Sequence, residues 1–325
     1  MRCLRPFHGI IAALTITLTW SAAQADVRFA TGVDATFLTM VVAVDKGFMA
    51  KQGVKAEIKQ FASGAVSLEA VVSGDADIAF ASELAVLRPL SKGAKITALA
   101  RPLYSNNLMG IAAKKGIAQP RDFVGHTIGY AKGTASEYYL NLLVSHYQLD
   151  PKSFRLVNVA APEMVPAMAR GDIDVMVAWE PWFTRLRTVV PDTKVIAKSG
   201  DENVYTLQYL VMASQSALAS KRDEVAKTMR ALIEATDWLN DPKNHAEAAE
   251  ILARTFHIPP ADAELQLGQI VYTLDLDRAF EGDLRRAADW LNAQDLIHVD
   301  SVQKLVDDLI RPDLLRTLAP DRVRL

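Results

Sequence analysis

Two glutamates, Glu83 and Glu180, end two copies of one short phrase and are well placed to do chemistry. The copies begin at Gly74 and Gly171, and each reads Gly-Asp-x-Asp followed by an apolar run. A carboxylate at a strand end can bind an ammonium group or accept hydrogen bonds from hydroxyl and amide groups. Each glutamate could equally cap the next helix or pair with a surface lysine or arginine, so both readings stay open.

Aromatic residues surround the second glutamate. Trp179, Pro181 and Trp182 flank Glu180. The faces of two indoles could stack on a flat ligand, or hold an alkyl chain or a cation. Aromatic side chains are also common core residues, so plain packing is the alternative. We expect both tryptophans at a ligand site, with Tyr209 as a weaker candidate.

The segment 133–137 is the best candidate for an anion site. A helix start offers unpaired backbone N–H groups and the positive end of the helix dipole. Thr134 and Ser136 add hydroxyl donors on either side of Ala135. The spacing from Thr134 to Glu137 also fits a capping box, in which the glutamate turns back onto its own backbone.

The loops after the first two predicted strands supply the remaining candidates. Asp34, Thr36 and Phe37 follow the first strand. Ser63 and Gly64 follow the second strand, with exposed amides ahead of a helix that could cradle an anion. Because ligands bind outside the carboxyl ends of strands in open α/β sheets, we expect these residues to line the same cleft. Ser82, directly before Glu83, belongs to the same predicted lining.

Several other kinds of chemistry lack a supporting pattern. The six histidines show no metal-ligand spacing, and there is no Gly-x-Ser-x-Gly elbow and no P-loop. The only cysteine is Cys3, near the start of the chain. The residues after the N-terminal signal segment therefore contain no thiol for a disulfide or a nucleophile. We therefore expect no catalytic residue, no cofactor and no metal.

The first residues are typical of a secretory signal. Arg2 and Arg5 precede an apolar core at 10–20, and Ala23-Gln24-Ala25 is a small-x-small cleavage site. We expect export to the periplasm with cleavage after Ala25. Loss of the two arginines changes the formal net charge from −2 to −4, which argues against a nucleic-acid partner.

The elements that must position these residues alternate between strands and helices. This alternation predicts an α/β protein with mainly parallel sheets and helices on their faces. The repeated phrase predicts two similar lobes, each with a helix–turn–strand unit. After residue 217 the apolar spacing is near 3.6 and predicts helices over 224–239, 246–255, 261–273, 284–292 and 302–310. The predicted strands are 27–30, 55–61, 78–81, 96–100, 127–130, 154–159 and 195–197, with crossing segments at 108–113 and 208–213. The predicted divisions are a signal peptide at 1–25, lobe 1 at 26–112, lobe 2 at 113–207, and a return to lobe 1 with C-terminal helices at 208–325.

With these residues in view, the chain resembles the periplasmic solute-binding proteins of ABC importers for aliphatic sulfonates, taurine, nitrate and thiamine-type precursors. The resemblance covers nearly all of the chain after the leader. It implies a type II periplasmic binding protein fold, with a ligand cleft between two α/β lobes and a helical C-terminal region on lobe 1. The matching residues are Asp45-Lys46-Gly47-Phe48 with Gly53, the two Gly-Asp-x-Asp phrases, Asp122-Phe123-x-Gly125, Gly133-Thr134-Ala135-Ser136 and Trp179-Glu180-Pro181.

What the resemblance implies is a binding protein, not an enzyme, that closes on a small-molecule ligand and presents it to a membrane permease. It implies that 34–37, 63–64 and 134–136 line the cleft, and that Glu180 helps to bind amine-bearing ligands. Two glutamates with no obvious cleft arginine favour an organic ligand over a bare inorganic anion. We expect a monomer. The alternatives are a periplasmic protein that reports ligand occupancy to a membrane sensor, or an enzyme of the same fold.

Overall fold

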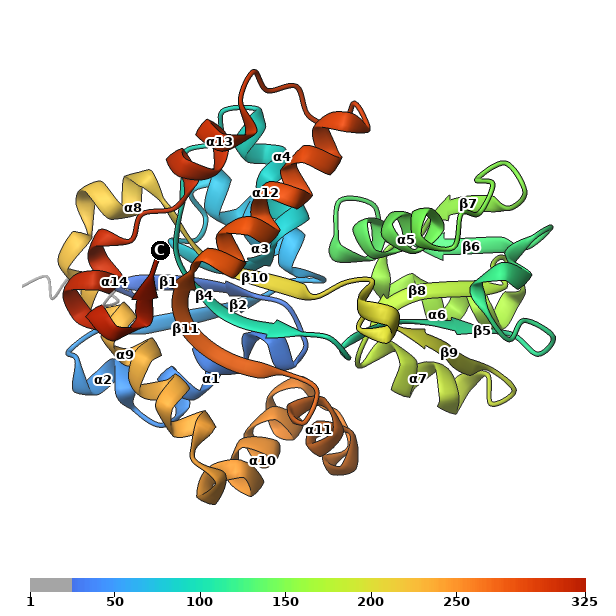
Figure 1. Ribbon diagram of the computed structural model, residues 1–325. Coiled ribbons are helices and arrows are strands. Elements are labelled where there is room, and N and C mark those ends of the chain that lie inside the picture. Colours follow the sequence, from blue (N-terminus) through green and yellow to red (C-terminus); the bar gives the residue numbers. More distant parts are fainter. Residues whose placement is uncertain (1–24) are drawn as a thin grey trace, which may run out of the picture.

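Two sheets organise residues 25–325, the part of the chain that the computed structural model describes. Lobe 1 is built on a seven-stranded sheet in the order β12-β11-β4-β10-β3-β1-β2, and lobe 2 on a five-stranded sheet in the order β7-β6-β8-β5-β9. The lobes lie side by side in Figure 1, with lobe 2 in green on the right. The predicted export leader falls almost entirely on residues 1–24, outside the described residues.

The strands have the following bounds. Lobe 1 contains β1 (Val27–Thr31), β2 (Ala56–Gln60), β3 (Ile78–Ser82), β4 (Ile96–Ser105), β10 (Leu207–Ser214), β11 (Val271–Asp277) and β12 (Val323–Arg324). Lobe 2 contains β5 (Met109–Ala113), β6 (Thr127–Tyr130), β7 (Arg155–Asn158), β8 (Val175–Trp179) and β9 (Lys194–Lys198). In both lobes three strands pair in parallel, β1 with β2 and β3, and β6 with β7 and β8.

Helices cover both sheets, and the longest helices lie in lobe 1. The helices of lobe 1 are α1 (Leu38–Asp45), α2 (Phe48–Lys51), α3 (Gly64–Ser73), α4 (Glu83–Ser91), α8 (Gln215–Ser220), α9 (Arg222–Asn240), α10 (His245–Phe256), α11 (Pro260–Leu267), α12 (Arg278–Ala293), α13 (Val302–Leu309) and α14 (Asp313–Leu318). Lobe 2 has α5 (Ala135–His146), α6 (Ala161–Arg170) and α7 (Trp182–Val189). Among residues 25–325, no helix is long and apolar enough to cross a membrane.

The repeated phrase forms the same turn in each lobe. Gly74 ends α3 with φ 88°, and Gly171 ends α6 with φ 86°. A left-handed residue at a helix end is ordinary for glycine and strained for most other residues. Both turns lead directly into a strand buried along its whole length, β3 or β8. The helix–turn–strand repeat predicted from the sequence is therefore confirmed.

The second aspartate of each phrase accepts a hydrogen bond from an equivalent backbone N–H in the two lobes. Asp77 Oδ2 accepts a hydrogen bond from the backbone N–H of Arg28 in β1 at 2.9 Å, and Asp174 Oδ2 accepts one from Thr127 in β6 at 3.0 Å. Each bond ties the turn to the neighbouring parallel strand. The aspartates therefore fix the register of β3 beside β1 and of β8 beside β6, which sets where these strands end.

The chain crosses between the sheets at 106–108 and at 199–206. The expected division at residue 112 lies later than the first crossing, because β5 pairs with β8 and β9 and so belongs to lobe 2. The predicted return segment at 208–213 lies within β10, which pairs antiparallel with β3 and β4 inside lobe 1.

One C-terminal expectation was wrong. A helix was predicted over 261–273, but α11 ends at Leu267 and β11 follows, paired antiparallel with β4. The sequence of β11 alternates: Tyr272, Leu274 and Leu276 are buried, while Val271 is exposed. A period of two is the strand signature, and it competes here with the helical spacing of the flanking segments.

Candidate ligand-binding cleft

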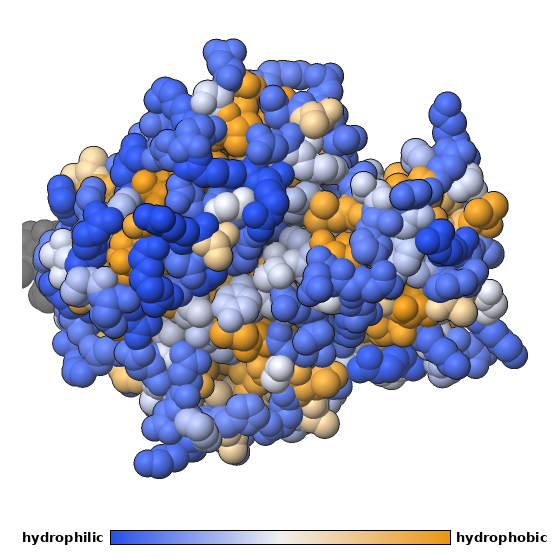
Figure 2. Space-filling view, viewed as in Figure 1, coloured by the Kyte–Doolittle hydropathy of each residue, from blue (hydrophilic) through white to orange (hydrophobic). Residues whose placement is uncertain are grey.

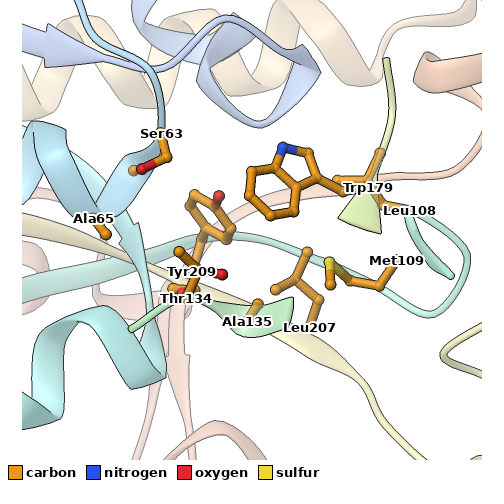
Figure 3. A pocket seen from close by; sticks show the side chains of 11 residues that line it. Ser63, Ala65, Leu108, Met109, Thr134, Ala135, Trp179, Leu207 and Tyr209 are labelled. Carbon is orange, nitrogen blue, oxygen red and sulfur yellow. The ribbon is translucent and has the colours of Figure 1, made fainter. Parts of the chain in front are cut away.

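A narrow cavity lies where β3 and β8 end, between the two lobes, with about 320 Å³ of empty space when the open solvent at its mouth is included. Ser82 is the last residue of β3 and Trp179 the last residue of β8, so the cavity sits at the carboxyl ends of equivalent strands. This is the usual position for a ligand in open α/β sheets. Its lining is Ser63, Gly64, Ala65, Ser82, Leu207 and Tyr209 from lobe 1, and Leu108, Met109, Thr134, Ala135 and Trp179 from the first crossing and lobe 2 (Figure 3).

Two helices begin at the cavity, one from each lobe. Ser63 is the N-cap of α3 and Thr134 is the N-cap of α5, and each side-chain oxygen accepts a hydrogen bond from the first turn of its own helix. The backbone N–H groups of Gly64, Ala65 and Ala135 have no acceptor among the described residues. Unpaired amides at two helix starts are a suitable site for an anion.

Close packing explains how the start of α3 reaches the cavity. A Cβ added to Gly64 would lie 3.3 Å from the carbonyl oxygen of Phe80 in β3 and 3.5 Å from the ring of Phe37. A larger residue at this position would push the helix start away from the strand. Glycine therefore lets the amides of α3 approach the end of β3.

The rest of the wall is apolar and aromatic. The indole of Trp179 and the ring of Tyr209 approach the cavity from opposite lobes, and Leu207 and Met109 lie beside them (Figure 3). Phe37 packs edge-on against Tyr209, with 6.0 Å between ring centroids. The lining thus combines an amide-rich part with a part suited to hydrocarbon.

Asp34 lies behind this wall. Its Oδ2 accepts a hydrogen bond from Trp179 Nε1 at 3.1 Å, and its Oδ1 accepts one from the amide of Thr36 at 2.9 Å and one from the Thr36 hydroxyl at 2.5 Å. Burial raises the pKa of the Asp34 carboxyl to about 6, although these hydrogen bonds act in the opposite direction. The sequence predicted ligand contacts at Asp34, Thr36 and Phe37. These residues do not line the cavity, and they support the residues that do.

Glu180 requires a correction. Its Oε2 accepts a hydrogen bond from the amide of Thr184 at 3.0 Å, in the first turn of α7, and its Oε1 lies 3.8 Å from Arg187 Nη1. The side chain is 1% exposed and is not part of the cavity lining. Glu180 was expected either to contact a ligand or to cap the next helix, and in the structure it accepts a hydrogen bond from the start of α7. Trp182 is also buried away from the cavity, with the guanidinium of Arg185 4.7 Å from its ring centroid.

Two further predicted residues have partners inside the protein. Glu83 begins α4 and accepts a hydrogen bond from the Tyr205 hydroxyl at 2.5 Å, so it lies outside the first cavity. Ser136 accepts a hydrogen bond from the amide of Ala131 and donates one to the carbonyl of Val177 at 2.7 Å. Ser136 thereby fixes the loop before α5 against β8 and leaves its neighbours to face the cavity.

Glu137 turns back onto its own backbone, but it reaches the amide one residue before the N-cap Thr134, so the reciprocal pair of a capping box is not formed. Its Oε2 accepts a hydrogen bond from the amide of Gly133 at 2.7 Å. The same carboxylate forms a two-point ion pair with Arg88 of α4, at 2.9 Å from Nη1 and 3.1 Å from Nη2. Arg88 belongs to lobe 1 and Glu137 to lobe 2, so this pair joins the lobes beside the cavity.

Comparison with known proteins identifies the family of this chain. A family model described as NMT1/THI5 like matches residues 34–245, which is more than half of the chain. The chain belongs to the NMT1/THI5-like family. The predicted resemblance to periplasmic solute-binding proteins agrees with the relatives found. The taurine-binding periplasmic protein of Escherichia coli is 28% identical over 270 residues, which cover 78% of this chain and 80% of that protein.

Solved structures show the same fold. The alkanesulfonate-binding protein SsuA of Xanthomonas axonopodis pv. citri, bound to MOPS, superposes with a TM-score of 0.75 at 18% identity, covering 90% of this chain and 100% of that one. The periplasmic nitrate-binding protein NrtA of Synechocystis gives a TM-score of 0.73 at 16% identity, covering 91% and 88%. The predicted two-lobe binding-protein fold is therefore confirmed for this member of the NMT1/THI5-like family.

Sequence reasoning missed the apolar part of the lining in this NMT1/THI5-like chain. Leu108, Met109 and Leu207 stand at the two crossings between the lobes, and Ala65 follows Gly64 in α3. Nothing chemical distinguishes these residues in the sequence. The signal available was positional, because residues next to a crossing segment must lie at the junction of the two sheets.

Proposed function

We propose that this protein is the solute-binding component of an ABC importer, exported to the periplasm, and that it captures a small organic anion between its lobes. The ligand class that fits best is an aliphatic sulfonate, which the bound protein would present to a membrane permease. Membership of the NMT1/THI5-like family and the relation to the E. coli taurine-binding protein support this role.

The observation that carries the proposal is the set of free amides at two helix starts. The N–H groups of Gly64 and Ala65 come from lobe 1 and that of Ala135 from lobe 2. A sulfonate has three oxygens, each able to accept such a bond, and both helix dipoles favour negative charge at this point. Since the anion would take donors from both lobes, its binding favours closure.

The apolar lining favours an organic anion over nitrate or bicarbonate. A bare oxyanion would leave Leu108, Met109 and Leu207 facing empty space, whereas a short alkyl chain would cover them. The described residues that line this cavity include no carboxylate and no lysine or arginine. An ammonium group on the ligand thus finds no direct ionic partner there, so we expect ethanesulfonate to bind at least as well as taurine.

The lining also favours binding over catalysis. Ser63, Ser82 and Thr134 offer hydroxyl groups, but none of the described lining residues is a histidine, lysine, cysteine, aspartate or glutamate that could activate them. We therefore propose a protein without enzymatic activity.

The test is calorimetric titration of the mature protein with ethanesulfonate, taurine and nitrate. Ala135→Pro removes one N–H at the first position of α5, where proline is compatible because Thr134 is extended with ψ 174°. Losing one charge-assisted hydrogen bond should weaken ethanesulfonate binding about tenfold. Arg278→Pro, at the exposed first position of α12, is the matched control. Unaltered affinity in Ala135→Pro, or no binding of any sulfonate, contradicts the proposal.

A further inference from the structure

A second cavity opens between α5 of lobe 2 and α12 of lobe 1. Its empty space, with the open solvent at its mouth included, is about 940 Å³, and Figure 2 shows a notch between the two lobes on this face of the molecule. The connection that leads into β10 contributes residues 203–206 to its lining. Its lining is Glu83, Tyr138, Leu142, Asn203, Val204, Tyr205, Thr206, Asp283, Arg286, Asp289 and Trp290. None of these residues lines the first cavity.

Glu83 carries an unused acceptor at this cavity. The side chain is 2% exposed, and its Oε1 accepts the Tyr205 hydrogen bond at 2.5 Å. Its Oε2 is buried with no hydrogen-bond partner among the described residues. A buried polar atom left unpaired costs free energy, so such an atom beside a cavity calls for a donor from a ligand.

The charge around Glu83 favours a cation. Asp283 and Asp289 of α12 line the same cavity. The side-chain amide of Gln208 donates a hydrogen bond to Asp283 Oδ2 at 2.6 Å. The one basic residue in the described lining is Arg286, which pairs with Asp283 and has a 71% exposed side chain. Solvent screens the positive charge of a guanidinium that is so exposed. The carboxyl groups of the lining therefore dominate the electrostatics inside the cavity.

Aromatic rings complete the wall. The ring centroid of Tyr138 lies 5.4 Å from that of Tyr205 and 5.0 Å from that of Trp290. These three rings come from lobe 2, from the second crossing and from lobe 1. Ring faces attract cations and also cover methylene groups.

We propose that this second cavity binds a small organic ammonium ion, whose N–H donates to Glu83 Oε2 while its carbon chain lies against Tyr138, Tyr205 and Trp290. The ligand needs at least one N–H, since the free carboxylate oxygen is an acceptor. Because α5 and α12 belong to different lobes, an occupant would contact both and favour the arrangement in which Tyr138 lies against Trp290. This site shares no lining residue with the sulfonate site, and the proposal does not rest on the transport role.

The experiment is titration of the mature protein with n-butylammonium chloride in amine-free buffer above pH 8, where the Glu83 carboxyl, whose pKa burial raises to about 8, is ionised. Butan-1-ol lacks the charge and tetramethylammonium lacks the N–H, so both should bind at least about tenfold more weakly. Glu83→Gln keeps the shape and the acceptor for Tyr205 but removes the charge, and it should weaken n-butylammonium binding about tenfold. Trp290→Leu removes one ring without touching the carboxylate and should weaken binding as well.

Three controls make the result decisive. Asp295→Asn removes an 89% exposed carboxylate just beyond α12 and should leave n-butylammonium binding unchanged. Ethanesulfonate affinity, measured without amine, should be the same in Glu83→Gln and wild type. Failure of sulfonate binding alone would count against the transport proposal and not against this one. The ammonium site is overturned if n-butylammonium does not bind, or if both Glu83→Gln and Trp290→Leu bind it as tightly as wild type.

Discussion

The indole Nε1 of Trp179 donates a hydrogen bond to Asp34 Oδ2, at 3.1 Å, across the junction of the two lobes. Trp179 ends β8 in lobe 2, and Asp34 follows β1 in lobe 1. One face of the same indole lines the first cavity. A ligand that packs on Trp179 therefore also acts on a bond that holds the lobes together.

Trp179→Phe should loosen this closure. Phenylalanine keeps an aromatic face for the ligand but has no N–H, so the buried Asp34 carboxylate loses a donor. Ethanesulfonate affinity should fall about tenfold, and the radius of gyration of the ligand-free protein in X-ray scattering should rise. Trp238→Phe, in α9 of lobe 1, is the control and should change neither quantity. Equal radii for Trp179→Phe and wild type would show that the bond does not hold the lobes.

Arg88 and Glu137 form the second connection between the lobes, and a double-mutant cycle can measure it. Their side chains are only 17% and 8% exposed, so the pair is shielded from solvent. Arg88→Gln and Glu137→Gln should each lower ethanesulfonate affinity. The double-mutant cycle should give a coupling between the two residues of about 1–2 kcal/mol in the free energy of ethanesulfonate binding. The exposed pair Lys304–Asp308 is the reference and should show less than about 0.5 kcal/mol. Additive effects at Arg88 and Glu137 would remove the pair from the closing mechanism.

Much of the fold could be predicted because its signals are local. Gly74 and Gly171 each follow an apolar helix and precede an apolar strand, and this order alone identifies two equivalent lobes. The strand β11 was missed because its alternating residues stand between helical segments. A short period-two pattern carries less weight than the longer helical spacing around it.

The site was harder to predict because position along the chain does not fix the direction of a side chain. Ser63, Thr134 and Trp179 reach the cavity as expected. Glu180 follows Trp179 directly, yet its carboxylate turns into the first turn of α7. A glutamate before a helix can serve either a ligand or free backbone amides, and only the three-dimensional path of the chain decides between them.

Glu180→Ala should therefore affect stability and not binding. The substitution leaves the amide of Thr184 without its acceptor, which costs about 1 kcal/mol of folding free energy. Denaturant unfolding should show this loss, while calorimetry should show unchanged ethanesulfonate affinity. Glu163→Ala, in the first turn of α6, tests for a general effect of removing an acid there. A tenfold loss of affinity with unchanged stability would return Glu180 to the ligand site.

The last prediction concerns the pH dependence of stability. Burial raises the pKa of the Glu83 carboxyl from its ordinary 4.5 to about 8, and the negative charge of Asp283 adds to the rise, while the Tyr205 hydrogen bond opposes it. Between these two values the unfolded chain has released a proton that the folded protein still holds. The contribution of Glu83 to stability is therefore complete below pH 4.5 and is lost as the pH rises through 8.

Asp34 contributes with the same sign in a lower range, because burial raises its pKa from 3.8 to about 6. Asp34 is half ionised near pH 6 and Glu83 near pH 8, so Glu83 is the main one of these two carboxyls to titrate toward pH 8. In Glu83→Gln the group is neutral at every pH, and Tyr138, Tyr205, Asp283, Arg286 and Asp289 around it are unchanged. Thermal unfolding in amine-free buffers should then show a fall in Tm from pH 6 to 8 that is smaller in Glu83→Gln than in wild type. Asp34→Asn should flatten the curve mainly between pH 3.8 and pH 6, the ordinary and the raised pKa of this carboxyl. Parallel curves for wild type and Glu83→Gln would mean that Glu83 is already ionised in the folded protein, with a partner for its free oxygen that this structure does not contain.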